Sequence, residues 1–209
     1  NLLKQYFGFD SFRPLQEKII NHVLSGHDTC VVMPTGSGKS LCYQLPALAL
    51  DGVTLVISPL IALMKDQVDG LRANGIKAAC INSTIPTTDI QTILAEVKQG
   101  TWKLLYLAPE RLAMPVFREQ LKNLPIRLIT VDEAHCISEW GHDFRPDYRN
   151  LASLRELFPG VPWIALTATA NEQVRNDIVK QLGLKDGRMF LSSFNRPNLT
   201  YLVRPKQQW

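Results

Sequence analysis

A glycine-rich loop between an apolar run and a potential helix is the feature that most constrains the fold of this chain. Residues 33–40 read MPTGSGKS, follow the apolar residues 30–32 and lead into a stretch that can continue as a helix. A strand, a glycine loop and a helix in this order form a phosphate-binding loop, in which backbone N–H groups and the positive end of the helix dipole face phosphate oxygens. We therefore expect the chain to bind a nucleoside triphosphate.

The residues of this loop have distinct expected roles. Lys39 would reach the β- and γ-phosphates, and the Ser40 hydroxyl would hold Mg²⁺. Met33 departs from the strict pattern, which has glycine at that place. The alternative, a Gly/Ser turn with an incidental lysine, is disfavoured because strand, loop and helix agree. The set expected to bind Mg-ATP in this segment is Thr35, Gly36, Ser37, Gly38, Lys39, Ser40 and Leu41.

The composition indicates an ordinary globular chain of one large domain or two small ones. Of its 209 residues, 45% are hydrophobic and 20% are charged, and the net charge of +4 permits nucleic-acid contact without arguing for it. The four cysteines are scattered without a C-x-x-C pair, so we expect reduced thiols in an intracellular protein, and neither zinc nor disulfides. No apolar run approaches the roughly 18 residues of a membrane span, and no signal peptide opens the chain. The expected location is the cytoplasm or nucleoid of a bacterium, or a eukaryotic nucleus, with no membrane partner.

Short apolar runs alternate with helical patterns along most of the chain. The runs lie at residues 29–32, 53–57, 78–81, 104–107, 128–131 and 163–166. The helical stretches between and after them cover residues 39–49, 61–73, 88–99, 115–122, 148–157 and 172–182, and two further helices at 2–7 and 14–25 precede the first run. Nearly continuous apolar runs are typical of buried parallel strands, so the pattern predicts an α/β fold: a doubly wound, mostly parallel sheet with helices on both faces. Ligands of such sheets bind at the carboxyl ends of the strands, and each candidate motif of this chain follows a predicted strand.

Two acidic residues follow the predicted strand at 128–131. Asp132 would coordinate Mg²⁺, usually through water, because this ion prefers hard oxygen ligands. Glu133 would orient and deprotonate the attacking water, while Lys39 and the metal stabilise charge on the γ-phosphate. His135 would sense the γ-phosphate or couple to a neighbouring motif. The alternative is a solvated acidic turn that caps a helix, which the nearby glycine loop disfavours.

Asp-Glu-Ala-His beside the glycine loop resembles a superfamily 2 helicase, and further segments resemble the RecQ family of ATP-dependent DNA helicases. The segments are FGFDSFRPLQ at 7–16, similar to the family's adenine-reading motif, SPLIALMKDQV at 58–68, APERL at 108–112, ALTATA at 165–170, the aromatic-rich CISEWGHDFRPDY at 136–148, and SFNRPNL at 193–199. The resemblance covers essentially the whole chain. It implies a RecA-like P-loop NTPase domain at 1–195 and a linker at 196–209 toward a second motor domain that is not in this chain.

The same resemblance implies an activity and partners. The full-length protein would use ATP and Mg²⁺ to move 3′ to 5′ on single-stranded DNA and unwind duplex or branched DNA. The second RecA-like domain of the same chain would supply an arginine finger, so this fragment alone should bind Mg-ATP, hydrolyse it slowly and unwind nothing.

The segment at 7–16 offers groups suited to a nucleobase. Gln16 carries an amide donor and acceptor, enough to read the N6 and N7 edge of adenine. Phe9 or Arg13 could stack on the ring. For Phe7 and Phe12 we favour a plain role in the core.

The loop from 140 to 148 concentrates aromatic and charged residues just after the acidic pair. Aromatic faces stack on unpaired bases, worth about 1–3 kcal/mol per base, and Arg145 would add a phosphate contact. DNA in this loop could then move the catalytic acids. The alternative is an ordinary loop with Trp140 in a hydrophobic pocket. The residues expected to bind DNA or transmit its binding here are Trp140, His142, Asp143, Phe144 and Arg145.

Five residues elsewhere complete the expected nucleic-acid site. Thr167 and Thr169 would relay between the acids and bound DNA, or alternatively cap the following helix. Ser58, Lys65 and Arg111 would grip the sugar–phosphate backbone, although Lys65 could equally be a solvated charge.

Two other classes of protein remain open from the sequence. One is an RNA helicase of the same superfamily, which ATPase stimulation by DNA or RNA would distinguish. The other is a non-catalytic nucleic-acid-binding module, against which the presence of Lys39, Ser40, Asp132 and Glu133 argues.

Overall fold

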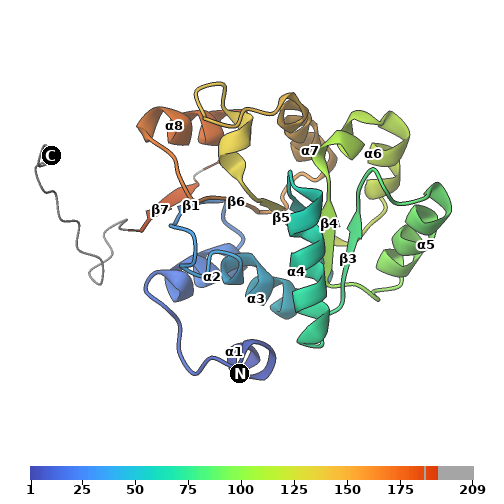
Figure 1. Cartoon of the computed structure of the whole chain (residues 1–209), viewed down its shortest axis with the longest axis horizontal. Helices are drawn as coiled ribbons and strands as arrows, with labels where there is room; N and C mark the ends of the chain where they lie inside the picture. Colours follow the sequence, from blue (N-terminus) through green and yellow to red (C-terminus); the bar gives the residue numbers. More distant parts are fainter. Residues whose placement is uncertain (186, 193–209) are drawn as a thin grey trace, which may run out of the picture.

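The computed structural model describes residues 1–185 and 187–192, which form one seven-stranded sheet (Figure 1). All strand pairs are parallel, and the strand order is β3-β4-β2-β5-β6-β1-β7. The strands are β1 (Thr29–Val32), β2 (Val53–Ile57), β3 (Ala78–Ile81), β4 (Leu104–Leu107), β5 (Ile126–Val131), β6 (Trp163–Thr167) and β7 (Arg188–Leu191). All six predicted strands are present, and β7 was not predicted.

Helices connect the strands largely as the sequence indicates. They are α1 (Leu2–Phe7), α2 (Gln16–Leu24), α3 (Leu41–Ala49), α4 (Ile61–Ala73), α5 (Thr87–Lys98), α6 (Pro115–Leu121), α7 (Leu151–Leu157) and α8 (Glu172–Gln181), with 3₁₀ turns η1 (Pro109–Ala113), η2 (Ala134–Ile137) and η3 (Pro146–Asn150). None of the helices among the described residues has both the length and the apolar character needed to cross a membrane.

Two helix starts differ from the prediction. Pro14 precedes α2 instead of lying in its first turn, because Leu15 has a left-handed backbone (φ 70°) and α2 begins only at Gln16. Tyr148 lies in η3, and α7 begins at Leu151. In η3 the Tyr148 hydroxyl donates to the backbone oxygen of Asp132 (2.9 Å), which ties this turn to the end of β5.

Helices cover both faces of the sheet, as predicted for a doubly wound fold (Figure 1). Helices α2, α3 and α4 pack on one face around Tyr43, Val56 and Met64. Helices α5, α6, α7 and α8 pack on the other face around Leu55 and Trp163. Successive residues of β2 thus enter opposite cores, which is why its sequence is apolar throughout.

The carboxyl ends of the central strands meet at one edge of the sheet. The glycine loop follows β1, which pairs with β6, and β6 in turn pairs with β5, which ends before Asp132. Thr167 is the last residue of β6. The prediction that the motifs lie at one edge is therefore confirmed for the glycine loop, for Asp132 and Glu133, and for Thr167.

An ion pair between buried Asp28 and half-buried Arg155 lies at the amino ends of the central strands. The Asp28 carboxylate accepts hydrogen bonds from the guanidinium of Arg155 (2.8 and 3.2 Å) and from the backbone N–H groups of Trp163 (2.9 Å) and Lys185 (2.8 Å). The Arg155 guanidinium also lies over the Trp163 ring, 4.6 Å from its centroid. One carboxylate therefore joins β1, β6, α7 and the segment before β7.

The seventh strand extends the described domain to Leu191. It pairs with β1 and has one buried residue, Phe190, so it is much less buried than the other strands. The SFNRPNL segment at 193–199 and the expected linker at 196–209 lie outside the described residues.

Candidate functional site

The glycine loop has the backbone that phosphate binding requires. Gly36 and Gly38 have φ angles of 80° and 84°, in the left-handed region that favours glycine. The Ser37 hydroxyl donates to the oxygen of Pro34 (2.5 Å) and braces the turn. Met33 continues the pairing of β1, since its N–H donates to the oxygen of Thr167 (3.1 Å) and its side chain is buried. Met33, which replaces the glycine of the strict pattern, thus packs in the core, and the two glycines that shape the loop are present.

A cavity of about 530 Å³ lies against this loop. It gathers most of the residues predicted to bind the nucleotide: Phe9, Arg13, Gln16, Thr35, Gly36, Gly38, Lys39, Ser40, Leu41, Asp132 and Glu133. It also includes Ser11, Leu63 and Gln67, which sequence reasoning did not single out. Gln67 lies in the 58–68 segment, in which only Ser58 and Lys65 were assigned a predicted role, and its Oε1 accepts a hydrogen bond from Gln44 (2.9 Å).

At the base end of the cavity, the residues predicted to contact adenine also contact the glycine loop. Phe9 is 49% exposed and available to stack. Gln16, however, is only 3% exposed: its Oε1 accepts from the Arg13 N–H (2.8 Å), and its Nε2 donates to the oxygen of Gly38 (3.0 Å). Arg13 in turn donates to the oxygen of Gly36 (2.6 Å). Gln16 and Arg13 therefore support the glycine loop. These two bonds use one N–H and one lone pair of the Gln16 amide, and its second N–H and second lone pair remain for a base in the cavity that Gln16 lines.

The two phenylalanines beside this segment are core residues, as favoured. Phe7 and Phe12 are half-buried and pack against a small apolar cluster between α1, α2 and α3 that includes Leu3 and Leu41.

The two acids have opposite electrostatic environments. Asp132 is 9% exposed, and burial, followed by the neighbouring charge of Glu133, raises its pKa to about 6. The hydrogen bond from His135 holds the pKa of Glu133 below its usual value, with further help from Lys39. Glu133 also has a left-handed backbone (φ 47°), and its N–H donates to Asp132 Oδ1 (3.0 Å). Adjacent carboxyls whose pKa values are pushed apart are suited to different roles, and Glu133 is the one held ionised.

His135 links the acids to the next strand and to the following loop. Its Nδ1 lies 2.8 Å from Thr167 Oγ1 and 3.3 Å from Glu133 Oε2. Its ring stacks on His142, with centroids 4.6 Å apart. Thr167 is buried and lies within 3.2 Å of the Thr169 oxygen. The helix-capping alternative for the two threonines is wrong, because Asn171 caps α8.

The aromatic loop presents Trp140 to solvent. Trp140 is 67% exposed, so the alternative of a tryptophan buried in a pocket is wrong. Phe144 is half-buried, and the guanidinium of Arg149 lies over its ring, 5.1 Å from the centroid. Tyr148, the last aromatic of the segment, is fully buried and does not belong to the exposed surface.

Arg145 ties this loop to the start of α4. It donates to the oxygen of Pro59 (3.2 Å) and to Asp143 Oδ2 (3.2 Å), and its own N–H donates to the oxygen of Cys136 (2.8 Å). The guanidinium predicted to contact phosphate is therefore already engaged within the protein.

The three residues expected to grip a nucleic-acid backbone have different surroundings. Lys65 is exposed on α4. Ser58 is 1% exposed, so its side chain does not reach the surface. The Arg111 guanidinium donates to the oxygen of Asn82 (2.6 and 3.2 Å) and holds the end of β3. Lys65 alone of the three has the exposure that the prediction requires.

Comparison with known proteins identifies the class to which this fold and site belong. The family model described as DEAD/DEAH box helicase matches residues 13–177, and the chain belongs to that family.

Individual relatives narrow the assignment to the RecQ group. The chain is 50% identical over 206 residues to the ATP-dependent DNA helicase RecQ of Haemophilus influenzae, covering 99% of this chain and 33% of the relative. It is 49% identical over 205 residues to the RecQ of Bacillus subtilis, covering 97% of this chain and 35% of the relative. The chain is thus a RecQ-type helicase domain that spans about a third of the length of these curated relatives.

A solved structure agrees with the fold. The crystal structure of the DUF1998 helicase MrfA bound to DNA superimposes with a TM-score of 0.72 at 21% identity, covering 91% of this chain and 29% of that one. At this identity the likeness concerns the fold alone.

Proposed function

We propose that this chain is the ATP-binding motor domain of a RecQ-type DNA helicase. In the full-length protein it binds Mg-ATP and couples hydrolysis to 3′–5′ movement on single-stranded DNA and to duplex unwinding. The observation that carries the proposal is a chain of contacts from the nucleotide cavity to an exposed aromatic loop: Glu133 contacts His135, and His135 stacks on His142 beside Trp140.

The donor set at the cavity fits Mg²⁺ and phosphates. The Ser40 hydroxyl and the Asp132 carboxylate are hard oxygen ligands that line the same cavity as the Lys39 ammonium. Bound Mg²⁺ would supply positive charge to the phosphates. Lys39 neutralises the β- and γ-phosphates, and the loop N–H groups orient them.

Glu133 is the best-placed general base. Its lowered pKa keeps it ionised at neutral pH, so its oxygen can accept a proton from water. The contact of Glu133 with His135 fixes the direction of the carboxylate, and His135 is in turn fixed by Thr167. A displacement of His135 would therefore change the position of the base.

The aromatic loop supplies the connection to DNA. The exposed Trp140 indole can stack on an unpaired base. The loop also contacts the segment before α4 through Arg145. A DNA strand bound to the loop would therefore act on the turn at Asp132 and Glu133, here called the acid turn, and on the 58–68 segment. The printed names of the relatives, ATP-dependent DNA helicase, agree with DNA as the ligand.

Full activity requires a second RecA-like domain that supplies an arginine finger, so the 209-residue chain alone should hydrolyse ATP slowly and unwind nothing. Robust unwinding by the isolated chain would contradict this part of the proposal.

The test is steady-state ATPase of the full-length parent protein with no nucleic acid, with single-stranded DNA and with single-stranded RNA. We expect strong stimulation by DNA, and a Glu133→Gln variant that binds ATP but has lost hydrolysis at least a hundredfold. Stimulation by RNA alone would instead identify an RNA helicase. ATP binding without hydrolysis under any condition would identify a non-catalytic binding module.

A further inference from the structure

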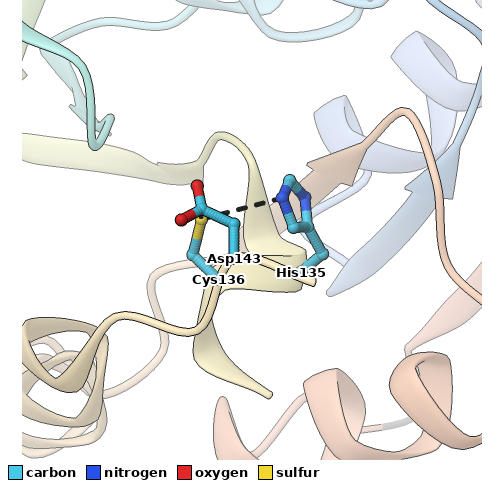
Figure 2. A group of neighbouring side chains, drawn as sticks. All are labelled: His135, Cys136 and Asp143. Carbon is cyan, nitrogen blue, oxygen red and sulfur yellow. Dashed lines mark hydrogen bonds between the residues drawn. The ribbon is translucent and has the colours of Figure 1, made fainter. Parts of the chain in front are cut away.

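Three potential metal ligands converge where the acid turn meets the aromatic loop. His135 and Cys136 lie in η2, and Asp143 approaches them from the loop (Figure 2). Cys136 Sγ is 3.8 Å from His135 Nε2 and 3.7 Å from Asp143 Oδ2, and the ligand atoms of all three residues lie within 4.8 Å of one another.

These spacings fit a tetrahedral zinc ion. With Zn–S near 2.3 Å and Zn–N or Zn–O near 2.0–2.2 Å, a tetrahedral ion holds sulfur about 3.6 Å from each of the other two ligands. Both distances from Cys136 Sγ are within a few tenths of an ångström of that value. The remaining edge, from His135 to Asp143, is at most 4.8 Å and would have to shorten to about 3.4 Å, which rotation of the half-exposed Asp143 side chain would allow.

The ligands also have the outer contacts that zinc sites use. A metal-binding histidine usually donates its other ring N–H to an oxygen, which fixes the tautomer. His135 Nδ1 has two such oxygens, Thr167 Oγ1 at 2.8 Å and Glu133 Oε2 at 3.3 Å, so Nε2 is left to accept a metal. The carboxylate of Asp143 is oriented by Arg145, which donates to Oδ2 at 3.2 Å. The Arg145 charge opposes a cation, and the two negative ligands must outweigh it.

The ligand chemistry favours zinc over the magnesium of the nucleotide site. A thiolate and an imidazole are ligands of zinc, whereas Mg²⁺ selects oxygen. A thiolate, a carboxylate and a neutral imidazole together carry two negative charges, which one Zn²⁺ neutralises. The site shares no ligand with Ser40 and Asp132.

We propose that His135, Cys136 and Asp143 bind Zn²⁺, with water as the fourth ligand, and that the bound ion pins the aromatic loop to the acid turn. The metal replaces the thiol hydrogen of Cys136, and one proton leaves to solvent. Cysteine spacing alone predicted no zinc in this chain. That expectation rested only on pairs of cysteines, and the structure brings together a mixed set of ligands instead. Zinc binding itself does not depend on the proposed helicase activity.

Binding is tested on the 209-residue chain with Zn²⁺ and with Co²⁺ as a spectroscopic probe. We expect one equivalent of Co²⁺ to give the visible bands of a tetrahedral ion and the near-ultraviolet band of a thiolate ligand, both displaced by Zn²⁺. The variants Cys136→Ser and Asp143→Asn should each bind Zn²⁺ at least tenfold more weakly. The control Cys80→Ser changes a half-buried cysteine on β3 and should bind as the wild type does. Circular dichroism establishes whether each variant is folded. If Cys136→Ser does not fold, Asp143→Asn tests the site, because its position is half-exposed.

Equal affinity of the wild type and Asp143→Asn, or loss of binding in Cys80→Ser, would overturn the site. The restraint on the loop has a separate readout, amide hydrogen exchange of residues 138–145, which should slow at least fivefold in wild type with Zn²⁺ and not in Asp143→Asn. Unchanged exchange in a zinc-bound wild type would overturn the pinning. Neither readout uses ATP or DNA, so a failure here is distinct from a failure of the proposed function.

Discussion

The burial of Asp132 should lower the free energy of unfolding when no nucleotide or metal is bound. Its pKa is raised from 3.8 to about 6, so the folded state disfavours the ionised carboxylate. An acid whose pKa is higher in the folded state than in the unfolded state lowers stability once the pH exceeds the unfolded value, and the loss is complete above the folded value. This pKa difference corresponds to a loss of about 3 kcal/mol in the free energy of unfolding at pH 8. At pH 5 the loss is about half as large, because the carboxyl is then mostly protonated in the folded state.

The variant Asp132→Asn removes the charge and keeps an oxygen to accept the Glu133 N–H. We expect its free energy of unfolding to exceed that of the wild type by about 2–3 kcal/mol at pH 8, and by about half as much at pH 5. The assay is urea unfolding of the chain in chelator without nucleotide. Asp66→Asn, which changes an exposed carboxylate on α4, is the control and should leave stability nearly unchanged. A variant no more stable than the wild type at pH 8, or a gain that does not shrink at pH 5, would refute the electrostatic reasoning.

Three other predictions concern positions away from this carboxylate. Asp28→Ala should lower the free energy of unfolding by about 3–5 kcal/mol, because it leaves the half-buried Arg155 without its partner, and a loss below about 1 kcal/mol in urea unfolding would show that the pair is dispensable. Gly36→Ala and Gly38→Ala should both weaken ATP binding, because both positions have a positive φ. Gly38→Ala should lose more affinity in nucleotide titrations, since its Cβ would also displace the Gln16 amide from the loop, and equal losses would argue against that contact. Thr167→Val removes the hydroxyl beside His135 and should reduce DNA-stimulated ATPase of the parent protein at least tenfold, and unaltered stimulation would remove Thr167 from the path.

Local patterns predicted the features that depend on neighbouring residues in the chain. The six strands, the glycine loop and the acid turn all follow from apolar runs and from residue types at fixed spacing, and the parallel sheet then brings them to one edge. The edge strand β7 was not predicted, because its apolar run is only the three residues 189–191, and only Phe190 of them is buried.

Contacts between distant segments could not be predicted in this way. The Gln16 amide has the donor and acceptor expected of a base-reading group, but the sequence did not indicate that it also bonds to Arg13 and to the glycine loop. Arg111 and Ser58 have suitable chemistry for backbone contacts, yet one holds the end of β3 and the other is buried. Nothing in the sequence around Tyr148 indicates that its hydroxyl bonds to Asp132. Each depends on a partner that only the folded chain supplies.

The proposed function depends on transmission of DNA binding from the aromatic loop to the hydrolytic site. The decisive experiment is steady-state ATPase of the full-length parent protein with and without single-stranded DNA, for the wild type, Trp140→Ala and Val116→Ala. Val116 is an exposed apolar residue on α6, outside the loop, and serves as the matched control. We expect strong stimulation of the wild type and the control, and a Trp140→Ala enzyme that keeps only its DNA-free rate. Normal stimulation of Trp140→Ala would show that the loop does not couple DNA to Glu133, and a wild type indifferent to DNA would contradict the helicase proposal itself.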